Sequence, residues 1–291
     1  MSDAQNEKTP GLSPDEEQEV SHNQPPRAAV LHEIIRAQGD HELERTLAAL
    51  WWSALAAGLT MGLSLMAMGL FYARLPEGDS AQVIASLGYS AGFLAVILAR
   101  QQLFTENTLT AVLPLMTTPT LTNLGRLLRL WTIVLLGNLA GTLLVAWVML
   151  ELPIFDSKTD IAFLDVGRKV MENGIGQMFA KGIVSGWMIA TMVWMIPSME
   201  HAKIWIILMI TYLMALGDFT HIVVGSVEVS YLVWAGEQSW SAFWLDFALP
   251  TLAGNIIGGS FIFALISHAQ VRSDSGKPPS KLLKNDKEIR N

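Results

Sequence analysis

Two polar breaks inside long apolar stretches hold the residues of this chain whose types could do chemistry. The first break, Leu103–Asn107, reads Leu-Phe-Thr-Glu-Asn, and the second, Asp218–His221, reads Asp-Phe-Thr-His. A helix broken inside a bilayer leaves N–H and C=O groups that lipid cannot satisfy, so such a break persists only where protein or a water-filled cavity surrounds it. Two similar breaks therefore predict a pathway through a membrane.

His221 and Thr105 are the candidates for chemistry at these breaks. Imidazole changes charge around physiological pH more readily than other side chains, and a dry constriction disfavours its charged form. We therefore expect a neutral, proton-donating ring at His221. A half-helix starting near Thr105 or His221 would also attract anions to its positive end. The alternative is a buried histidine bonded to backbone, but the mirrored break favours the functional interpretation.

Charged and aromatic residues flank the breaks. Arg100 precedes the first break, Glu106 lies near its end, and Asp218 lies in the second. Burying three single ions is costly, so they either pair, as in an Arg100–carboxylate bridge, or face a wet vestibule and attract substrate. Tyr89 and Phe93, one helical turn apart, form either a hydrophobic gate or ordinary packing.

Three landmarks recur in the same order along the chain. The two Phe-Thr pairs are 115 residues apart, the Gly-Asn-x-x-Gly motifs Gly137–Gly141 and Gly254–Gly258 are 117 apart, and the Gly-x-x-x-Gly motifs Gly58–Gly62 and Gly182–Gly186 are 124 apart. This recurrence predicts a duplicated three-helix unit with broken helices meeting at mid-membrane. We expect the asparagine of each Gly-Asn-x-x-Gly motif to satisfy backbone freed by the breaks.

The composition is that of a membrane protein, because 51% of the 291 residues are hydrophobic, 15% are charged and the mean hydropathy is +0.38. Six apolar stretches are long enough to cross a bilayer, the second and fifth of them broken. They are Leu47–Leu70, Ala81–Ala99, Leu130–Leu150, Phe179–Pro197, Ile204–Trp234 and Phe247–Ser267. We predict an all-α membrane protein with an inverted repeat of three plus three helices.

The chain divides into a polar N-terminal segment, residues 1–45, a transmembrane domain, 46–270, and a tail, 271–291. We expect disorder over residues 1–24, a helix over Ala28–Leu47 and no cleavable signal. Lys and Arg gather in the two terminal segments and in loops on the same side of the spans. The positive-inside rule therefore predicts that both termini are cytoplasmic.

Several function classes are excluded. The net charge of −7 argues against nucleic-acid binding. The chain has no cysteine and no phosphate-binding loop, dinucleotide motif or nucleophile elbow, and its histidines have no metal-ligand spacing. We therefore expect neither an enzyme nor a bound cofactor or metal.

From about Leu47 to Ala269 the chain resembles the formate/nitrite transporter family of six-span bacterial transporters with an aquaporin-like fold. The resemblance rests on five motifs. They are Gly92-Phe93, Leu103-Phe104-Thr105, Gly182-Ile183 with Val193-Trp194-Met195, Phe219-Thr220-His221, and Gly254-Asn255-Ile256-Ile257-Gly258-Gly259.

The resemblance implies a homopentamer in the bacterial inner membrane, embedded in lipid, with one pore per subunit for a small monovalent anion such as formate or nitrite, linked to a proton. It makes Thr105 and His221 the central polar pair of the pore, with a vestibule lysine near Lys169. The other pathway residues that it implies are Tyr89, Phe93, Leu103, Phe104, Met214 and Phe219.

Departures from the family pattern bear on the substrate. Asp218 replaces a glycine, Thr220 replaces the glutamate of Phe-Glu-His, Gly186 follows Ser185 where a Cys-Asn pair is common, and Glu106 and Arg100 replace small residues. Two alternative functions follow. One is a channel for small neutral solutes, and the other is a non-conducting membrane scaffold whose tails recruit a partner.

Overall fold

Helices make up the regular structure of the part of the chain that the computed structural model describes, residues 13, 15, 16 and 26–275. In chain order they are α2 (Ala28–Glu44), α3 (Leu47–Tyr72), α4 (Asp79–Leu98), α5 (Val112–Thr117), α6 (Leu121–Glu151), α7 (Ser157–Met171), α8 (Ile175–Met195), η1 (Ile196–Ser198), η2 (Glu200–Ala202), α9 (Lys203–Leu216), α10 (Ile222–Trp234), α11 (Trp240–Ala242), η3 (Phe243–Ala248), α12 (Leu249–Ile256), η4 (Ile257–Ala264) and α13 (Leu265–Ser275). The predictions for residues 1–24 and for the tail lie largely outside these residues, and the domain boundaries stay predictions.

Five helical runs of the described residues are long and apolar enough to cross a membrane. They are Leu47–Tyr72, Asp79–Leu98, Leu121–Glu151, Ile175–Ser198 and Trp240–Ser273. The remaining predicted span is divided between α9, of 14 residues, and α10, of 13. At 1.5 Å per residue each is about 20 Å long, which is too short for a hydrocarbon core of about 30 Å.

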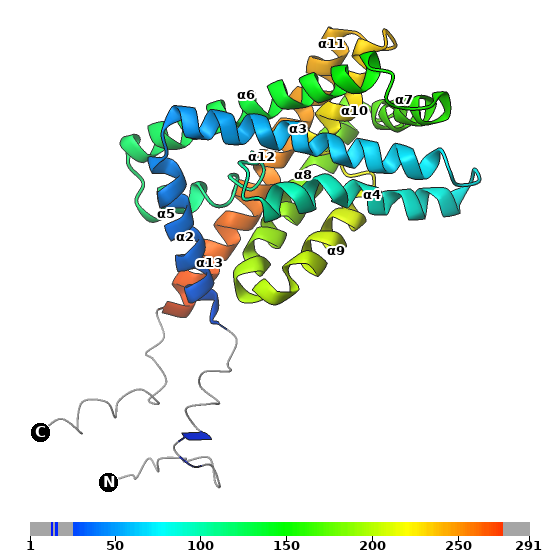
Figure 1. Cartoon of the computed structure of the whole chain (residues 1–291). Helices are drawn as coiled ribbons and strands as arrows, with labels where there is room; N and C mark the ends of the chain where they lie inside the picture. Colours follow the sequence, from blue (N-terminus) through cyan, green and yellow to red (C-terminus); the bar gives the residue numbers. More distant parts are fainter. Residues whose placement is uncertain (1–12, 14, 17–25, 276–291) are drawn as a thin grey trace, which may run out of the picture.

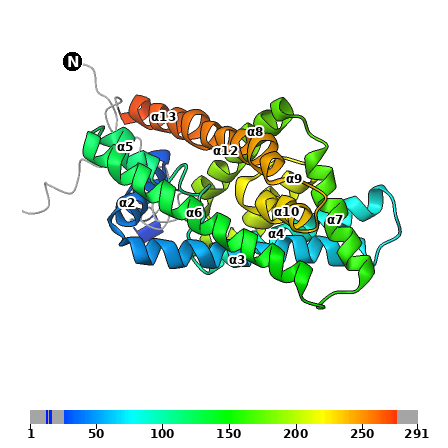
Figure 2. The ribbon, with the colours of Figure 1, turned by 90° about the horizontal axis from the view of Figure 1, so that it is seen from above.

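The bundle has two distinct ends. At the α2 end, α2 packs against α13 and α5, close to where both termini leave the bundle (Figure 1). This helix confirms the one predicted over Ala28–Leu47. At the opposite end, here called the α7 end, α7 covers α10 and the last turns of α3 (Figure 2).

Helix α10 is the central element. It packs against α3, α6 and α7, and residues 222–233 are all buried. A helix that is apolar on every side belongs in an interior rather than against lipid. The second break, at the start of α10, is therefore enclosed by protein.

The first break differs from the prediction in its downstream half. Residues 104–111 form turns, and the six-residue helix α5 begins only at Val112. The prediction that a half-helix starts near Thr105 is therefore wrong. Threonine and asparagine side chains explain the turns: Thr108 and Thr110 donate to the backbone oxygens of Thr105 and Glu106, at 2.7 and 3.1 Å, and thus offer the backbone partners other than a helix ladder.

The two breaks share backbone features at an offset of 118 residues rather than 115. Arg100 and Asp218, with φ of 53° and 50°, are the non-glycine residues of the described chain that take up the left-handed conformation. Each follows a helix that ends two residues earlier. The break residues are therefore equivalent at Arg100 and Asp218, and the match of Thr105 with Thr220 drawn from the Phe-Thr pairs is wrong.

The glycines at which helices pack closely correspond between the two halves at a different offset from the one that the Gly-x-x-x-Gly motifs suggested. A Cβ at Gly58 would lie 2.2 Å from the backbone oxygen of Asn138, and a Cβ at Gly186 would lie 2.3 Å from that of Asn255. Gly58 is thus the counterpart of Gly186, 128 residues on, so the expected offset of 124 is wrong by one helical turn. The asparagines keep the expected offset of 117.

Candidate substrate pathway

His221 and Thr105 bring the two breaks into contact. Thr105 Oγ1 and His221 Nε2 are 2.7 Å apart, and both residues are buried. His221 also caps α10, because its Nδ1 accepts from the backbone N–H groups of Val223 and Val224 at 3.2 and 3.3 Å. Since Nδ1 is an acceptor, the proton of the neutral ring is on Nε2, which donates to Thr105 Oγ1.

This arrangement leaves the Thr105 hydroxyl hydrogen unused among the described hydrogen bonds, since its oxygen serves as the acceptor for His221. A threonine hydroxyl can donate one bond while accepting another. Thr105 is therefore placed to offer a hydrogen-bond donor to a passing group.

Aromatic rings of α4 lie against the same histidine. The ring centroids of Phe93 and His221 are 5.1 Å apart in an edge-on arrangement, and those of Tyr89 and Phe93 are 5.4 Å apart. Leu103 and Met214 are fully buried nearby in the same core. Edge-on contact is the geometry that aromatic rings prefer, so packing and gating remain compatible interpretations of Tyr89 and Phe93.

Asn138 and Asn255 hold the breaks by equivalent hydrogen bonds. Asn138 Oδ1 accepts from the N–H of Phe104 at 2.9 Å, and its Nδ2 donates to the oxygen of Gln102 at 2.8 Å. Asn255 Oδ1 accepts from the N–H of Ile222 at 2.9 Å, and its Nδ2 donates to the oxygen of Thr220 at 3.2 Å. These bonds confirm the expectation that both asparagines satisfy freed backbone. They also show that Leu103 in the first break occupies the position equivalent to His221 in the second.

A cavity of about 670 Å³, here called the chamber, extends from the α7 end to His221. Four of the pathway residues line it, namely Tyr89, Met214, Phe219 and His221. Phe93, Leu103 and Thr105 lie beyond its lining, and Phe104 packs edge-on against Trp131 at 5.7 Å. The His221–Thr105 pair therefore lies at the floor of the chamber.

The charges of the chamber are mostly acidic. Its lining includes five carboxyl groups and two lysines: Glu77, Asp79, Asp165, Asp218, Glu228, Lys158 and Lys169. Lys169 Nζ is 2.7 Å from Asp218 Oδ1. The aspartate that replaces a glycine thus pairs with the lysine that the family resemblance places in a vestibule.

Arg100 and Glu106 are separate from this pair. Arg100 is exposed and forms no ion pair within the described part of the chain, so the alternative of an Arg100–carboxylate bridge is wrong. Glu106 is partly exposed and interacts electrostatically with Lys203 and Glu42, both toward the α2 end. The three charges predicted around the breaks therefore lie at different places.

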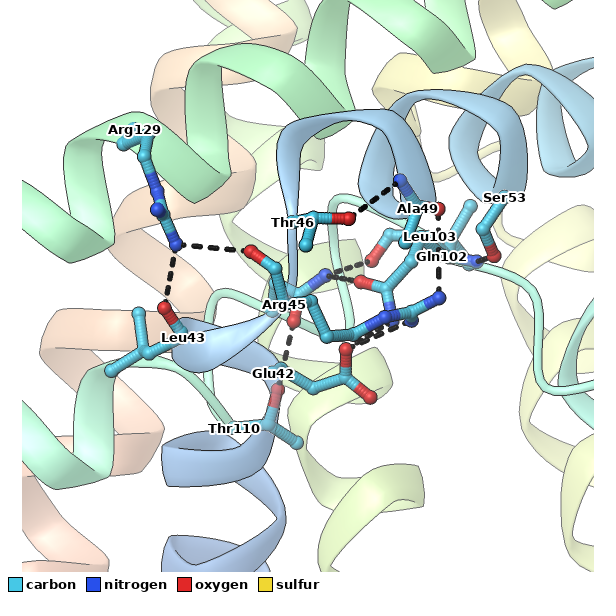
Figure 3. A network of polar contacts seen from close by, with 11 residues as sticks. Glu42, Leu43, Arg45, Thr46, Ala49, Ser53, Gln102, Leu103, Thr110 and Arg129 are labelled. Atoms are coloured by element: carbon cyan, nitrogen blue, oxygen red, sulfur yellow. Dashed lines mark hydrogen bonds and ion pairs between the residues drawn. The ribbon is translucent and has the colours of Figure 1, made fainter.

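A polar network ties the α2 end to the first break (Figure 3). Gln102 Nε2 donates to Glu42 Oε2 at 2.7 Å, and Glu42 forms an ion pair with Arg45 at 3.0 Å. Arg129 donates to the backbone oxygens of Leu43 and Arg45 at 2.6 and 3.3 Å. Gln102, next to Leu103 in the first break, is thus bonded to the end of α2, close to where α2 joins α3.

Sequence reasoning missed Gln102 and Glu228. Gln102 lies one residue outside the motif that was read as the break. Glu228 is the only acidic residue within α10, and an ionisable residue inside an apolar span is a functional candidate by default. The position of Glu228 inside an apolar helix is therefore a signal that the sequence contains.

Comparisons with known proteins agree with this architecture. The family described as formate/nitrite transporter matches residues 29–269. The inner membrane protein YfdC of Escherichia coli is 57% identical over 250 residues, covering 86% of this chain and 81% of that protein. The formate channel FocA of Haemophilus influenzae is 22% identical over 234 residues, covering 70% and 81%.

Solved structures give the same fold. A pentameric formate channel with formate bound superposes with a TM-score of 0.67 at 19% identity, covering 78% of this chain and 98% of that one. An ion channel of the same family also gives 0.67, covering 84% and 96%. With a family match over most of its length and a relative at 57% identity, this chain belongs to the formate/nitrite transporter family.

Proposed function

We propose that this protein carries a small monovalent weak-acid anion of the formate or nitrite kind across the inner membrane, together with a proton. Members of the family are transporters and channels rather than enzymes. The observation that carries the proposal is the hydrogen bond between Thr105 and His221, which joins the two breaks at the floor of the chamber.

The path follows from the chemistry of that floor. Beyond His221 the surrounding residues are the buried apolar side chains of Phe93 and Leu103, so an ion that leaves the chamber loses its hydration without gaining a counter-charge. A neutral acid avoids this cost. The Thr105 hydroxyl hydrogen is then available to an oxygen of the passing acid, while His221 Nε2–H keeps the threonine oxygen in place.

The fold that we propose around this path has six crossings in an inverted repeat. The paired breaks at an offset of 118 residues and the paired glycine contacts at 128 support two equivalent halves. The distribution of Lys and Arg supports cytoplasmic termini, which puts the α7 end and the chamber outside. The pentameric assembly of the structural neighbour supports a homopentamer.

Uptake into proteoliposomes tests the proposal. The full-length protein is reconstituted and the uptake of labelled formate and nitrite is followed with and without an inward proton gradient, against protein-free vesicles. We expect saturable uptake that rises with the gradient. Uptake no faster than in protein-free vesicles for both anions would refute the proposed substrates.

A neutral-solute channel remains the second candidate, because the chamber carries more carboxyl groups than lysines and a negative field repels anions. Such a channel would take up small uncharged solutes at a rate independent of the proton gradient. A non-conducting scaffold would show neither uptake and would lose its partner when residues 1–27 and 273–291 are removed.

A further inference from the structure

Glu228 is a buried carboxyl group inside the membrane domain. It lies in the second turn of α10, between Val227 and Val229, and only 4% of its surface is exposed. Its side chain nevertheless lines the chamber that leads to His221. A titratable group that is shielded by helices yet open to a water-accessible cavity can exchange protons or ions with that cavity.

Glu228 has no ion-pair partner of its own. Its charge is influenced by Lys169 and Asp218 of the chamber, but within the described residues it forms no ion pair and no side-chain hydrogen bond. Lys169, on the neighbouring helix α7, is already paired with Asp218 at 2.7 Å. The second lysine of the chamber, Lys158, is exposed on the first turn of α7.

Among the described groups that interact electrostatically with Glu228, Lys169 is the one positive charge, and it is shared with Asp218. The others are Asp218, Tyr72 of α3 and Tyr89 of α4. Glu77 and Asp79 lie near the mouth, and His221 lies at the floor. Within the described part of the chain, α6 and α12 contribute no side chain to the chamber lining, and η3 contributes only Phe247.

An isolated carboxylate is expensive to bury, and in practice such a group takes up a proton or a counter-ion. The chamber can provide either, because its excess of carboxyl groups raises the local concentration of cations and protons. Of these, a proton needs no coordination shell, and the described chain gathers no group of three or more His, Cys, Asp and Glu side chains around Glu228 that could hold a metal ion.

We propose that Glu228 is the proton-exchange group of the pathway, an inference that rests on the proposed transport of a weak acid. The protonated carboxyl group donates its proton to an anion in the chamber: the O–H bond of Glu228 breaks, an O–H bond forms on the substrate, and Glu228 becomes a carboxylate. The neutral acid moves past His221 and Thr105. A hydronium ion that enters the chamber from the outer solution then returns a proton to Glu228 and becomes water, and the steps reverse for movement in the other direction.

Two substitutions test this role in the reconstituted full-length protein. Glu228→Gln keeps the shape of the side chain but cannot exchange a proton, whereas Glu228→Asp keeps the carboxyl group. Glu172→Gln is the matched control, because the same change is made to an exposed residue that follows α7 and lies outside the chamber lining. We expect Glu228→Gln to lower the gradient-driven part of formate uptake at least about tenfold, with much of it kept in Glu228→Asp and all of it in Glu172→Gln.

Infrared spectroscopy gives a readout that does not depend on transport. A protonated carboxyl group shows a carbonyl stretch that shifts when H₂O is exchanged for D₂O. We expect such a band at neutral pH in the wild-type protein and its loss in Glu228→Gln. If the wild-type protein shows this band but takes up neither formate nor nitrite, the proposed substrates are refuted while the proton site is supported.

Three results would overturn the proposal, two of them spectroscopic. One is the absence of a difference between wild type and Glu228→Gln in this band across the neutral pH range. The other is the removal of the band by sodium or ammonium ions at constant pH, which would identify Glu228 as a cation site. Unchanged gradient-driven formate uptake in Glu228→Gln would equally refute a role in proton exchange.

Discussion

Gly186 lies where α8 crosses α12, and replacing it with alanine tests the close packing that supports the second break. A Cβ at this position would lie 2.3 Å from the backbone oxygen of Asn255 and 2.8 Å from its Cα. Ordinary contact begins at 3.4 Å, so the backbones would have to shift by about 1.1 Å. Because these atoms belong to a helix backbone, no side-chain rotation can relieve the overlap.

The cost of Gly186→Ala has two parts. Overpacking of a filled interior costs about 1–3 kcal/mol. The shift also loosens Asn255, which bonds the N–H of Ile222 at 2.9 Å and the oxygen of Thr220 at 3.2 Å. Interhelical hydrogen bonds in membranes contribute on average about 0.6 kcal/mol each, so we expect a total loss of about 2–4 kcal/mol.

Gly125→Ala is the matched control, because Gly125 lies in a helix, α6, and a Cβ there would meet nothing within 4 Å. Alanine favours a helix over glycine by up to about 1 kcal/mol, so this variant should be as stable as the wild type or slightly more so. The assay is the thermal unfolding midpoint of purified protein at one protein and detergent concentration. Equal midpoints for the Gly186 and Gly125 variants would refute the close-packing argument.

Two further predictions concern the floor of the chamber and the α2 end. Thr105→Val removes the oxygen that accepts from His221 Nε2 and leaves a buried donor without a partner, at a cost of about 1–3 kcal/mol. We expect a lower unfolding midpoint and slower formate uptake, and Thr105→Ser should restore both. Wild-type uptake by the valine variant would contradict the role given to this bond. His32 of α2 is bonded to His268 at 3.1 Å, and burial and that neighbouring ring hold the pKa of His32 below 6.5. Since detached α2 then binds a proton more readily than docked α2, the contact is stable above about pH 6.5 and weakens as the pH falls below that value. The protection of the α2 amides against hydrogen exchange, relative to the intrinsic exchange rate at each pH, should therefore fall on acidification in wild type and not in His32→Gln.

The sequence predicted which segments are broken, and the physical reason is plain. Polar residues and glycines inside runs long enough to span a bilayer stand out, because lipid cannot satisfy the backbone of an interrupted helix. The helix over Ala28–Glu44 and the backbone role of Asn138 and Asn255 were likewise predictable. These features depend on local composition, or on the requirement that backbone N–H and C=O groups inside a bilayer find hydrogen-bond partners.

The residue-by-residue correspondence between the two halves was not predictable from the recurring sequence motifs. The Phe-Thr pairs suggested an offset of 115, whereas the left-handed residues Arg100 and Asp218 give 118. Two residue pairs of the same type can arise at non-equivalent places, and only the hydrogen bonds of the asparagines reveal which backbone groups correspond. The ion pair between Lys169 and Asp218 was hidden for a similar reason, since it joins segments 49 residues apart.

The site was only partly visible in the sequence. Thr105 and His221 could be singled out, but not the tautomer of the histidine, which depends on the two backbone N–H groups that Nδ1 accepts. The sequence marks Glu228 as an ionisable residue between two valines, but nothing in it shows that α10 borders a cavity. Burial and cavity lining are properties of the packed bundle rather than of a segment.

The most direct test of the pathway is formate uptake by His221→Asn under an inward proton gradient. Asparagine is a favourable N-cap, so the variant keeps the start of α10 while it loses the ring that reaches Thr105. If the paired breaks form the conducting path, uptake should fall well below that of the wild type, while the variant still assembles as the wild type does. Unchanged uptake at every pH, by a protein that is correctly assembled, would contradict the account.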